Sequence, residues 1–310
     1  MRIVFFGTSE FAVKPLEAIL NSRHEVSAVI TQPVRQKGRG LKVLPQPVEE
    51  CADKQNVKIL KFPDVNSKDA IESLKKEAAH IFVVAAFGQI LKKDLLGVPA
   101  LYSINIHASL LPRYRGAAPI QRAIINGDKK TGISIIRMNE GLDGGDILSQ
   151  KEIAIDENDN SLTLSNKLSI LGAEMISDAL DIIESEDVKF SPQSGAEASY
   201  ASKLKKEDGL IGWEKDALSI RDLIRGCFPW PSAYTYIEGK MLKILDADLL
   251  PGDDIHKPGE ITDVNDKGIS VACGNGSLLV KKLQLEGKKP LHAAEFLRGK
   301  PLKKDMIFRR

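Results

Sequence analysis

The chain has 310 residues, a length typical of two domains. Hydrophobic residues make up 43% and charged residues 28%, as in globular proteins that bury a large core. The net charge of +2 excludes a protein that binds polyanions over its whole surface. Three widely spaced cysteines, Cys51, Cys227 and Cys273, lack metal-ligand spacing and predict reduced thiols in a cytosolic protein.

The charge is uneven along the chain. Residues 203–310 hold 20 Lys/Arg against 16 Asp/Glu, a net charge of +4, and residues 281–310 hold ten against three. Such a basic region fits a surface that lies against a polyanion, although a solvated face is its commoner meaning. No apolar run approaches the roughly 20 residues of a membrane span, so we expect a cytoplasmic protein without a signal peptide or membrane contact.

Strand and helix patterns alternate in the first part of the chain. Residues 3–6 predict a strand, a turn follows, and Ser9 is placed to cap a helix with an apolar side. Residues 25–31 and 57–60 predict further strands, 67–76 a helix, and 81–86 a strand buried on both faces. This order predicts an α/β fold with a parallel sheet. The G-x-G-x-x-G fingerprint is absent, so we do not infer a dinucleotide site.

The connection after the second predicted strand is long and basic. Residues 31–42 exceed the about two to six residues usual between a strand and a helix. The segment has no acidic residue, and its cations are Arg35, Lys37, Arg39 and Lys42. From composition alone, a functional loop and a solvated surface loop are both open.

Asn105 and His107 stand at the end of a strand predicted at residues 101–106. Alternation along a strand places both side chains on the same side, and parallel sheets bind ligands beyond the carboxyl ends of their strands. An amide donor beside an imidazole suits a reaction in which negative charge develops on a carbonyl oxygen. Taken alone, the pair is also consistent with a turn asparagine and a surface histidine.

The residues around this pair carry a family resemblance. The segment Asn105-Ile106-His107-Ala108-Ser109-Leu110-Leu111-Pro112-Arg113-Tyr114-Arg115-Gly116 resembles the folate-dependent formyltransferases. Ala117-Ala118-Pro119-Ile120-Gln121-Arg122 resembles the members of that family that act on methionyl-tRNA. The resemblance covers essentially the whole chain, and over ten matched positions are far more specific than a three-residue pattern.

The resemblance implies an α/β, Rossmann-like, mostly parallel sheet followed by a C-terminal OB-like β-barrel domain. We expect a catalytic domain at residues 1–189, a linker at 190–206 and a tRNA-binding domain at 207–310. The residue patterns agree, because a long helix predicted at 162–186 is followed by short strands between 234 and 285 with glycine turns. We expect the Phe228-Pro229-Trp230-Pro231 segment to anchor aromatic side chains in the core of the second domain.

The activity implied is transfer of a formyl group from 10-formyltetrahydrofolate to the α-amine of methionine on initiator tRNA. Asn105 and a protonated His107 would stabilise the oxyanion. Asp143 would pair with His107 and help to remove the amine proton. Asp143 precedes Gly144, where the family usually has Thr or Ala, and the extra glycine could loosen the loop. No metal is implied, and no His/Cys/carboxylate cluster has ligand spacing.

The resemblance also implies binding residues and partners. Folate contacts are implied for Phe87, Gly88, Ile90, Ser109, Leu110, Leu111 and Pro112, with core packing as the alternative for Phe87 and Ile90. Contacts with the tRNA acceptor stem are implied for Arg35, Lys37, Arg39 and Lys42, Arg39 above all. We expect a monomer that binds the folate co-substrate and the initiator tRNA and that does not contact a membrane.

Two other functions are open at this point, and two more are disfavoured. A formyltransferase for a small-molecule amine, such as a sugar nucleotide or glycinamide ribonucleotide, would share Asn105, His107 and Asp143. A hydrolase of 10-formyltetrahydrofolate would use water in place of the amine and release formate. A tRNA-binding module without activity is disfavoured by the intact set of catalytic residues, and a Rossmann dehydrogenase by the missing glycine fingerprint.

Overall fold

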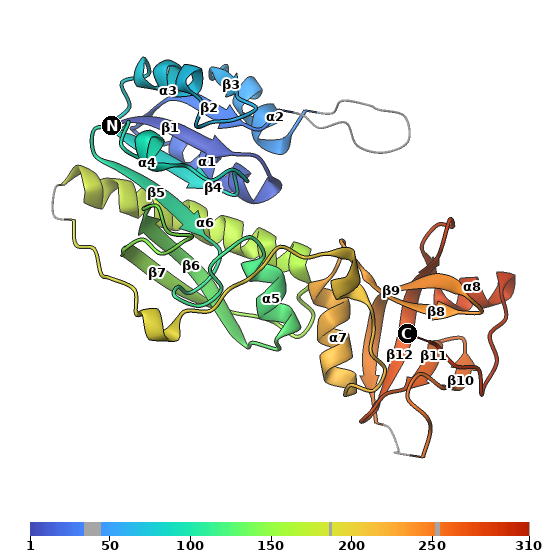
Figure 1. Ribbon diagram of the computed structural model, residues 1–310. Helices are drawn as coiled ribbons and strands as arrows, with labels where there is room; N and C mark the ends of the chain where they lie inside the picture. The colour runs from blue at the N-terminus through green and yellow to red at the C-terminus, as the bar shows by residue number, and fades with distance from the viewer. Residues whose placement is uncertain (34–44, 186–187, 252–254, 310) are drawn as a thin grey trace. The chain divides into compact units, whose positions relative to one another are not determined.

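The computed structural model describes residues 1–33, 45–185, 188–251 and 255–309, which divide into two compact units (Figure 1). Unit 1 comprises residues 1–119, 130–154 and 165–202, and unit 2 comprises residues 120–129, 155–164 and 203–310. In these described ranges, no helix combines the length and the apolar character needed to cross a membrane.

Unit 1 is built on a seven-stranded sheet in the order β3-β2-β1-β4-β5-β6-β7. Pairing is parallel from β3 through β5 and antiparallel for β5–β6 and β6–β7. This confirms the α/β fold with a mostly parallel, Rossmann-like sheet. The strands are β1 (Arg2–Gly7), β2 (Glu25–Thr31), β3 (Ile59–Lys61), β4 (Ile81–Ala85), β5 (Tyr102–His107), β6 (Lys130–Arg137) and β7 (Ile147–Ala154).

Helices cover both faces of this sheet. On one face, Leu74 and Leu95 join a buried cluster with Phe6 and Phe82. On the other face, a Cβ at Gly172 would lie 3.0 Å from the Ile106 side chain, so the long helix passes very close to the sheet. The helical segments are η1 (Glu10–Ala12), α1 (Val13–Leu20), α2 (Pro47–Lys54), α3 (Lys68–Lys75), α4 (Lys93–Leu96), α6 (Ser161–Glu184) and η2 (Gly195–Glu197).

One prediction about local structure in unit 1 is wrong, and one strand was not predicted. Ser9 precedes a short 3-10 helix and its side chain makes no capping hydrogen bond; its main-chain carbonyl accepts from Ala12 instead. The sequence pattern did not predict β7, because the strand is half exposed and its residues do not alternate between apolar and polar.

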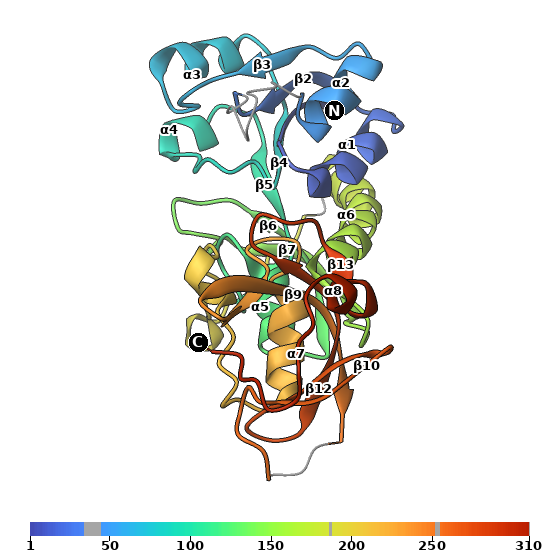
Figure 2. The same cartoon turned by 90° about the vertical axis from the view of Figure 1, so that its right-hand side faces the viewer.

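Unit 2 contains a six-stranded antiparallel sheet in the order β10-β11-β12-β9-β8, with β13 paired to β12 (Figure 2). Asp216 starts α7 by accepting a hydrogen bond from the Ser219 amide, and α7 then packs along β9. The elements are α5 (Pro119–Ile125), η3 (Lys206–Gly209), α7 (Ala217–Gly226), β8 (Ala233–Ile237), β9 (Lys240–Leu250), β10 (Ile261–Asn265), β11 (Gly268–Ala272), β12 (Ser277–Leu285), β13 (Leu291–His292) and α8 (Ala293–Gly299).

The predicted barrel is confirmed only as an antiparallel sheet. Strands β10 and β8 are the two ends of the strand order, and no continuous ladder of described residues joins them. Isolated bridges connect Ile307 to Glu260, beside β10, and Arg309 to Tyr236 of β8. The C-terminal segment thus contacts both ends of the sheet without closing it into a barrel of paired strands.

The aromatic anchor of unit 2 is not the one predicted. Trp230 is 55% exposed, because it lies in the turn that leads into β8. Trp213 is buried instead, stacks on Phe308 with ring centroids 5.7 Å apart, and donates its indole N–H to Thr235. The prediction that Trp230 packs in the core is therefore wrong.

Candidate active site

Asn105 and His107 lie in the last three residues of β5. Val84 of β4 and Ile136 of β6 pair with Asn105, so this position is central in the sheet. The side chains of Asn105 and His107 share one face, because they alternate with the buried Ile106. The pair therefore lies at the carboxyl edge of the parallel strands, where open α/β sheets place their ligands.

Asp143 meets both residues from the loop between β6 and β7. Its Oδ1 accepts a hydrogen bond of 3.3 Å from Asn105 Nδ2 and lies 3.7 Å from His107 Nδ1. Its Oδ2 accepts a 2.8 Å bond from the main-chain N–H of Gly116. The main-chain φ of Asp143 is +48°, an uncommon value for a residue with a side chain. The structure thus brings together the three residues predicted to be catalytic.

The imidazole of His107 has a defined orientation. Its Nε2 lies 3.0 Å from the carbonyl oxygen of Tyr114. A carbonyl oxygen only accepts, so this geometry assigns a proton to Nε2 and turns Nδ1 toward Asp143. The side chain of His107 is only 6% exposed and that of Asp143 is 16% exposed. Water therefore screens an electrostatic interaction between these two groups only in part.

The loop after β5 is held by polar side chains from β6 and β7. The hydroxyl of Ser134 donates to the carbonyl of Ser109 and accepts from the amide of Leu111. Gln150 donates to both the Leu111 carbonyl and the Ser134 hydroxyl. Ser109 is fully buried and donates its hydroxyl to the Arg113 carbonyl. Ser109 and Leu111 therefore bury their side chains within the protein, whereas Leu110 and Pro112 are partly exposed.

The two apolar side chains of the loop after β4 that were predicted to contact folate differ in their exposure. Phe87 is buried and packs edge-on against Phe6, whereas Ile90 is 71% exposed. The Phe87 carbonyl accepts from Gln32 Nε2, and a Cβ at Gly88 would lie 2.5 Å from that same nitrogen. Core packing is therefore the observed state of the Phe87 ring, and Ile90 presents its side chain to solvent.

A second exposed apolar side chain, Leu142, directly precedes Asp143 and is 54% exposed. An ion pair of 3.8 Å between Lys93 and Glu140 brings the chain after Ile90 close to the chain before Leu142. Two exposed apolar side chains thus belong to neighbouring loops at the edge of the sheet. Leu142 was not among the residues predicted to bind folate, although it directly precedes the predicted catalytic residue Asp143.

The two glycines after Asp143 have different surroundings. A Cβ at Gly145 would lie 1.7 Å from the carbonyl oxygen of Arg137, so only glycine fits. A Cβ at Gly144 would lie 3.7 Å from Arg115 Nη1, an ordinary contact, and the φ of Gly144 is not positive. The backbone therefore does not require glycine at position 144, where the family usually has Thr or Ala.

Sequence reasoning also missed Gln193, which lies in the segment predicted as a linker. Its amide donates to the carbonyls of Asp143 and Gly145, and its oxygen accepts from the guanidinium of Arg115. Residues 191–202 are hydrogen-bonded to unit 1 and do not form a free connection. The polar, turn-rich composition of this segment gave no signal of these contacts.

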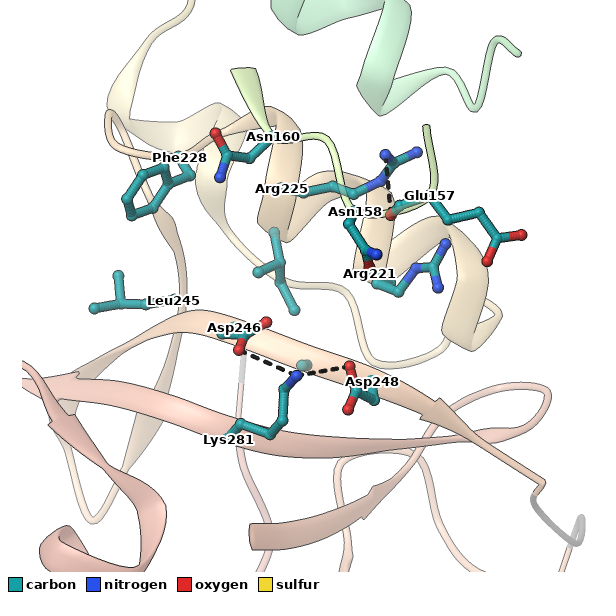
Figure 3. A pocket seen from close by; sticks show the side chains of 12 residues that line it. Glu157, Asn158, Asn160, Arg221, Arg225, Phe228, Leu245, Asp246, Asp248 and Lys281 are labelled. Carbon is teal, nitrogen blue, oxygen red and sulfur yellow. Dashed lines mark hydrogen bonds and ion pairs between the residues drawn. The ribbon is translucent and has the colours of Figure 1, made fainter. Parts of the chain in front are cut away.

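The basic residues predicted to bind tRNA, Arg35, Lys37, Arg39 and Lys42, lie outside the described residues. Unit 2 contains a pocket of about 110 Å³ (Figure 3). Arg221, Arg225 and Lys281 line it together with three acidic residues, and Lys281 pairs with both Asp246 and Asp248. The opposite charges balance, so the pocket does not by itself indicate an anionic ligand.

One cluster in the described part of the chain has ligand atoms close enough to hold a metal ion: His24, Asp181 and Glu184. Arg23 forms ion pairs of 2.7 Å with both acidic residues. Burial lowers the pKa of His24, which therefore favours its neutral form. We therefore interpret this cluster, together with Arg23, as an ion-pair network at the end of α6.

Two family descriptions match the chain: "Formyl transferase" over residues 1–180 and "Formyl transferase, C-terminal domain" over residues 203–301. The chain belongs to the formyl transferase family. The methionyl-tRNA formyltransferase of Geotalea daltonii is 44% identical to this formyl transferase over 299 residues, which cover 96% of this chain and 95% of that protein.

Two solved structures share the fold of this formyl transferase. Methionyl-tRNA formyltransferase from Clostridium thermocellum is 20% identical, with a TM-score of 0.56, and the match covers 81% of this chain and 94% of that chain. HypX from Aquifex aeolicus in complex with tetrahydrofolic acid is 17% identical, with a TM-score of 0.65, and the match covers all of this chain and 51% of that chain.

Proposed function

We propose that the chain transfers the formyl group of 10-formyltetrahydrofolate to the α-amino group of methionyl initiator tRNA, giving N-formylmethionyl-tRNA for translation initiation. The observation that carries this proposal is the 44% identity to a methionyl-tRNA formyltransferase along nearly the full length of both proteins. A match of this extent includes both the catalytic region and the C-terminal region.

The edge of the sheet in unit 1 has the chemistry to bind a folate. Ile90 and Leu142 offer exposed apolar surface for a flat ring, and the glycine at position 88 leaves main-chain atoms uncovered. We assign the folate contacts to main-chain atoms around Phe87, Gly88, Ser109 and Leu111 and to the side chains of Leu110, Pro112, Ile90 and Leu142. The co-substrate supplies an electrophilic formyl carbon at this edge.

Asn105 is the residue that stabilises charge on the formyl oxygen. Its Nδ2 has two N–H groups, and Asp143 accepts from only one of them. The second N–H is fixed in direction because the side chain is held by Asp143 and the strand is central in the sheet. A donor that is oriented before the reaction stabilises developing negative charge most effectively.

Asp143 and His107 form the acid–base part of the site. The Nδ1 of His107 faces the carboxylate of Asp143 over 3.7 Å, so the imidazole can pair with this carboxylate when it carries a proton on both nitrogens, and it then adds positive charge beside Asn105. The carboxylate is also the group placed to accept a proton from the attacking amine, directly or through a water.

We assign recognition of the tRNA to two basic regions. Arg35, Lys37, Arg39 and Lys42 would contact the acceptor stem, and the basic residues of 281–310 would face the phosphate backbone.

In this proposal the domain borders are 1–189, 190–206 and 207–310, the C-terminal domain is related to an OB barrel, and the protein acts as a cytoplasmic monomer. Size-exclusion chromatography with light scattering tests the monomeric state.

The function is tested by incubating the protein with 10-formyltetrahydrofolate and methionyl initiator tRNA, and then identifying the amino acid released from the tRNA by mass spectrometry. We expect N-formylmethionine, none when the tRNA is uncharged, and formation slowed by about 10²-fold or more when Asp143→Asn replaces the unaltered protein. Formate release without formylmethionine would instead identify a hydrolase.

A further inference from the structure

Residues 191–202, named here the brace segment, join two loops of the active site. Ser191 exchanges two main-chain hydrogen bonds with Ile147, next to the Asp143 loop. Ser199 and Ala201 form main-chain bonds with Arg115, in the loop that follows His107. The brace segment therefore runs from one loop to the other within unit 1.

Gln193 is the side chain of the brace segment that reaches both loops. Its Nε2 donates to the carbonyl of Asp143 over 2.8 Å and to the carbonyl of Gly145 over 2.6 Å. Its Oε1 accepts from Arg115 Nε over 3.0 Å and from Arg115 Nη2 over 2.7 Å. Both polar atoms are thus engaged twice, which fixes the orientation of the amide.

The backbone that Gln193 holds requires such support. Asp143 has a φ of +48°, a conformation that is unfavourable for a residue with a side chain and that its surroundings must hold. The loop has two glycines directly after Asp143, and these add conformational freedom to the unfolded and native chain. The hydrogen bonds from Gln193 span this glycine-containing stretch from the Asp143 carbonyl to the Gly145 carbonyl.

The brace segment also lies tightly against the other loop. Gly116 has a φ of +118°, and a Cβ there would lie 2.8 Å from the carbonyl of Ala201. The amide of Gly116 is the donor to Asp143 Oδ2. The brace segment therefore fixes both ends of the Gly116–Asp143 hydrogen bond: the donor by packing, and the acceptor through Gln193.

We propose that Gln193 is a positioning residue that sets the orientation of Asp143 toward Asn105, His107 and the Gly116 amide. This inference rests on the proposed formyl transfer for its kinetic consequence, although the position of Asp143 is measurable without it. Gln193 does not touch the reacting atoms in this proposal. It acts through the main chain of Asp143 and Gly145.

The decisive substitution is Gln193→Glu. Glutamate has nearly the same size and keeps an acceptor for Arg115, but it has no N–H to donate to the two carbonyls. We expect kcat for methionyl-tRNA formylation to fall by about 10- to 100-fold, because small misplacements of a catalytic group cost that much. The KM for either substrate should stay within about twofold. Ser194→Ala, at the exposed neighbouring position, is the matched control and should leave kcat unchanged.

Two further measurements separate positioning from a general structural effect. In an Asp143→Asn background, Gln193→Glu should cause no additional loss, because the two residues act as one unit. Hydrogen–deuterium exchange of the Gly116 amide should become at least about tenfold faster in Gln193→Glu, while exchange in the β5 strand stays unchanged.

Unchanged kcat and unchanged Gly116 exchange in Gln193→Glu would overturn the inference. Equal losses of kcat in the presence and absence of Asp143 would also overturn it, since they would show that Gln193 acts elsewhere. If the unaltered protein did not formylate methionyl-tRNA, the proposed function would fail, but faster exchange at Gly116 in Gln193→Glu would still support the positioning of Asp143.

Discussion

The side-chain amide of Asn105 donates to Oδ1 of Asp143 over 3.3 Å, although 38 positions separate the two residues in the chain. This bond gives Asn105 a fixed orientation and leaves its second N–H for a reacting oxygen. It also keeps one carboxylate oxygen of Asp143 beside His107 Nδ1. The proposed donor to the oxyanion and the proposed acceptor of the amine proton are therefore oriented by one contact.

Replacing Asn105 by alanine should lower kcat by about 10²–10³, the usual cost of losing one oxyanion donor. Affinity for the folate should change little, because the proposed folate contacts lie elsewhere. Steady-state kinetics and a fluorescence titration with a non-reactive folate measure the two quantities. Asn158→Ala, at an exposed position of unit 2, serves as the control. Near-normal turnover of Asn105→Ala would remove Asn105 from the mechanism.

Replacing Asp143 by asparagine keeps the size of the side chain but removes the charge beside His107. We expect a loss of about 10²-fold or more in kcat with little change in methionyl-tRNA affinity, since general base catalysis is worth about 10²–10⁴. Glu140→Gln, in the same loop and exposed, should keep full activity. A comparable loss in Glu140→Gln would mean that the loop, and not the carboxylate of Asp143, was responsible.

Alanine substitutions at the two glycines after Asp143 should have opposite effects on stability. Gly144→Ala should raise the free energy of unfolding by about 0.4–1 kcal/mol, because the backbone accepts a Cβ there and the unfolded chain loses entropy. Gly145→Ala should lower it by about 1–3 kcal/mol, because its Cβ would overlap the Arg137 carbonyl. Urea unfolding measures both values. Destabilisation by Gly144→Ala would show that the loop needs this glycine.

The cysteines of unit 2 should be unreactive in the folded protein. Burial raises the pKa of both Cys227 and Cys273 to about 12, so both remain thiols at neutral pH. Because the folded pKa is raised, their contribution to stability is present below about pH 9 and is lost as the pH rises toward 12. Labelling with a thiol reagent at pH 8, with and without urea, tests the prediction. Rapid labelling of both thiols without urea would contradict the burial.

Binding of tRNA should weaken steeply as salt increases, since Lys and Arg contacts with phosphates release counterions. Arg39→Ala should weaken binding and reduce the slope of log affinity against log salt by about one unit. Lys54→Ala, at an exposed position of α2, should leave the slope unchanged. An affinity that does not depend on salt would rule out the two basic regions as the tRNA-binding surfaces.

Much of unit 1 could be predicted from local patterns. The apolar runs of β1, β2 and β4 are buried on both faces, and Asn105 and His107 lie on one side of β5 because side chains alternate along a strand. Local patterns do not encode contacts between distant segments. Asp143 was therefore identified by resemblance alone, and its contacts depend on a loop that returns to the end of β5.

The contacts of Gln193 and the edge strand β7 could not be predicted from the sequence. Gln193 stands in a polar, turn-rich stretch whose composition is that of a linker, and its partners lie about 50 and 78 positions away. The half-exposed β7 lacks the alternation that marks a strand, because none of its residues is buried, and it is held as a strand by pairing with β6. In unit 2 the strands followed the predicted pattern, but strand patterns do not determine whether a sheet closes.

The central claim is tested most directly by offering one labelled formyl donor to three acceptors in the same reaction. Methionyl initiator tRNA, glycinamide ribonucleotide and water compete for the formyl group of 10-formyltetrahydrofolate, and the label is then counted in formylmethionyl-tRNA, in the formylated small amine and in formate. We predict that nearly all transferred label is found on methionyl-tRNA, and that the rate of this transfer falls by about 10²–10³ in Asn105→Ala. Label found mainly on the small amine or in formate would contradict the account.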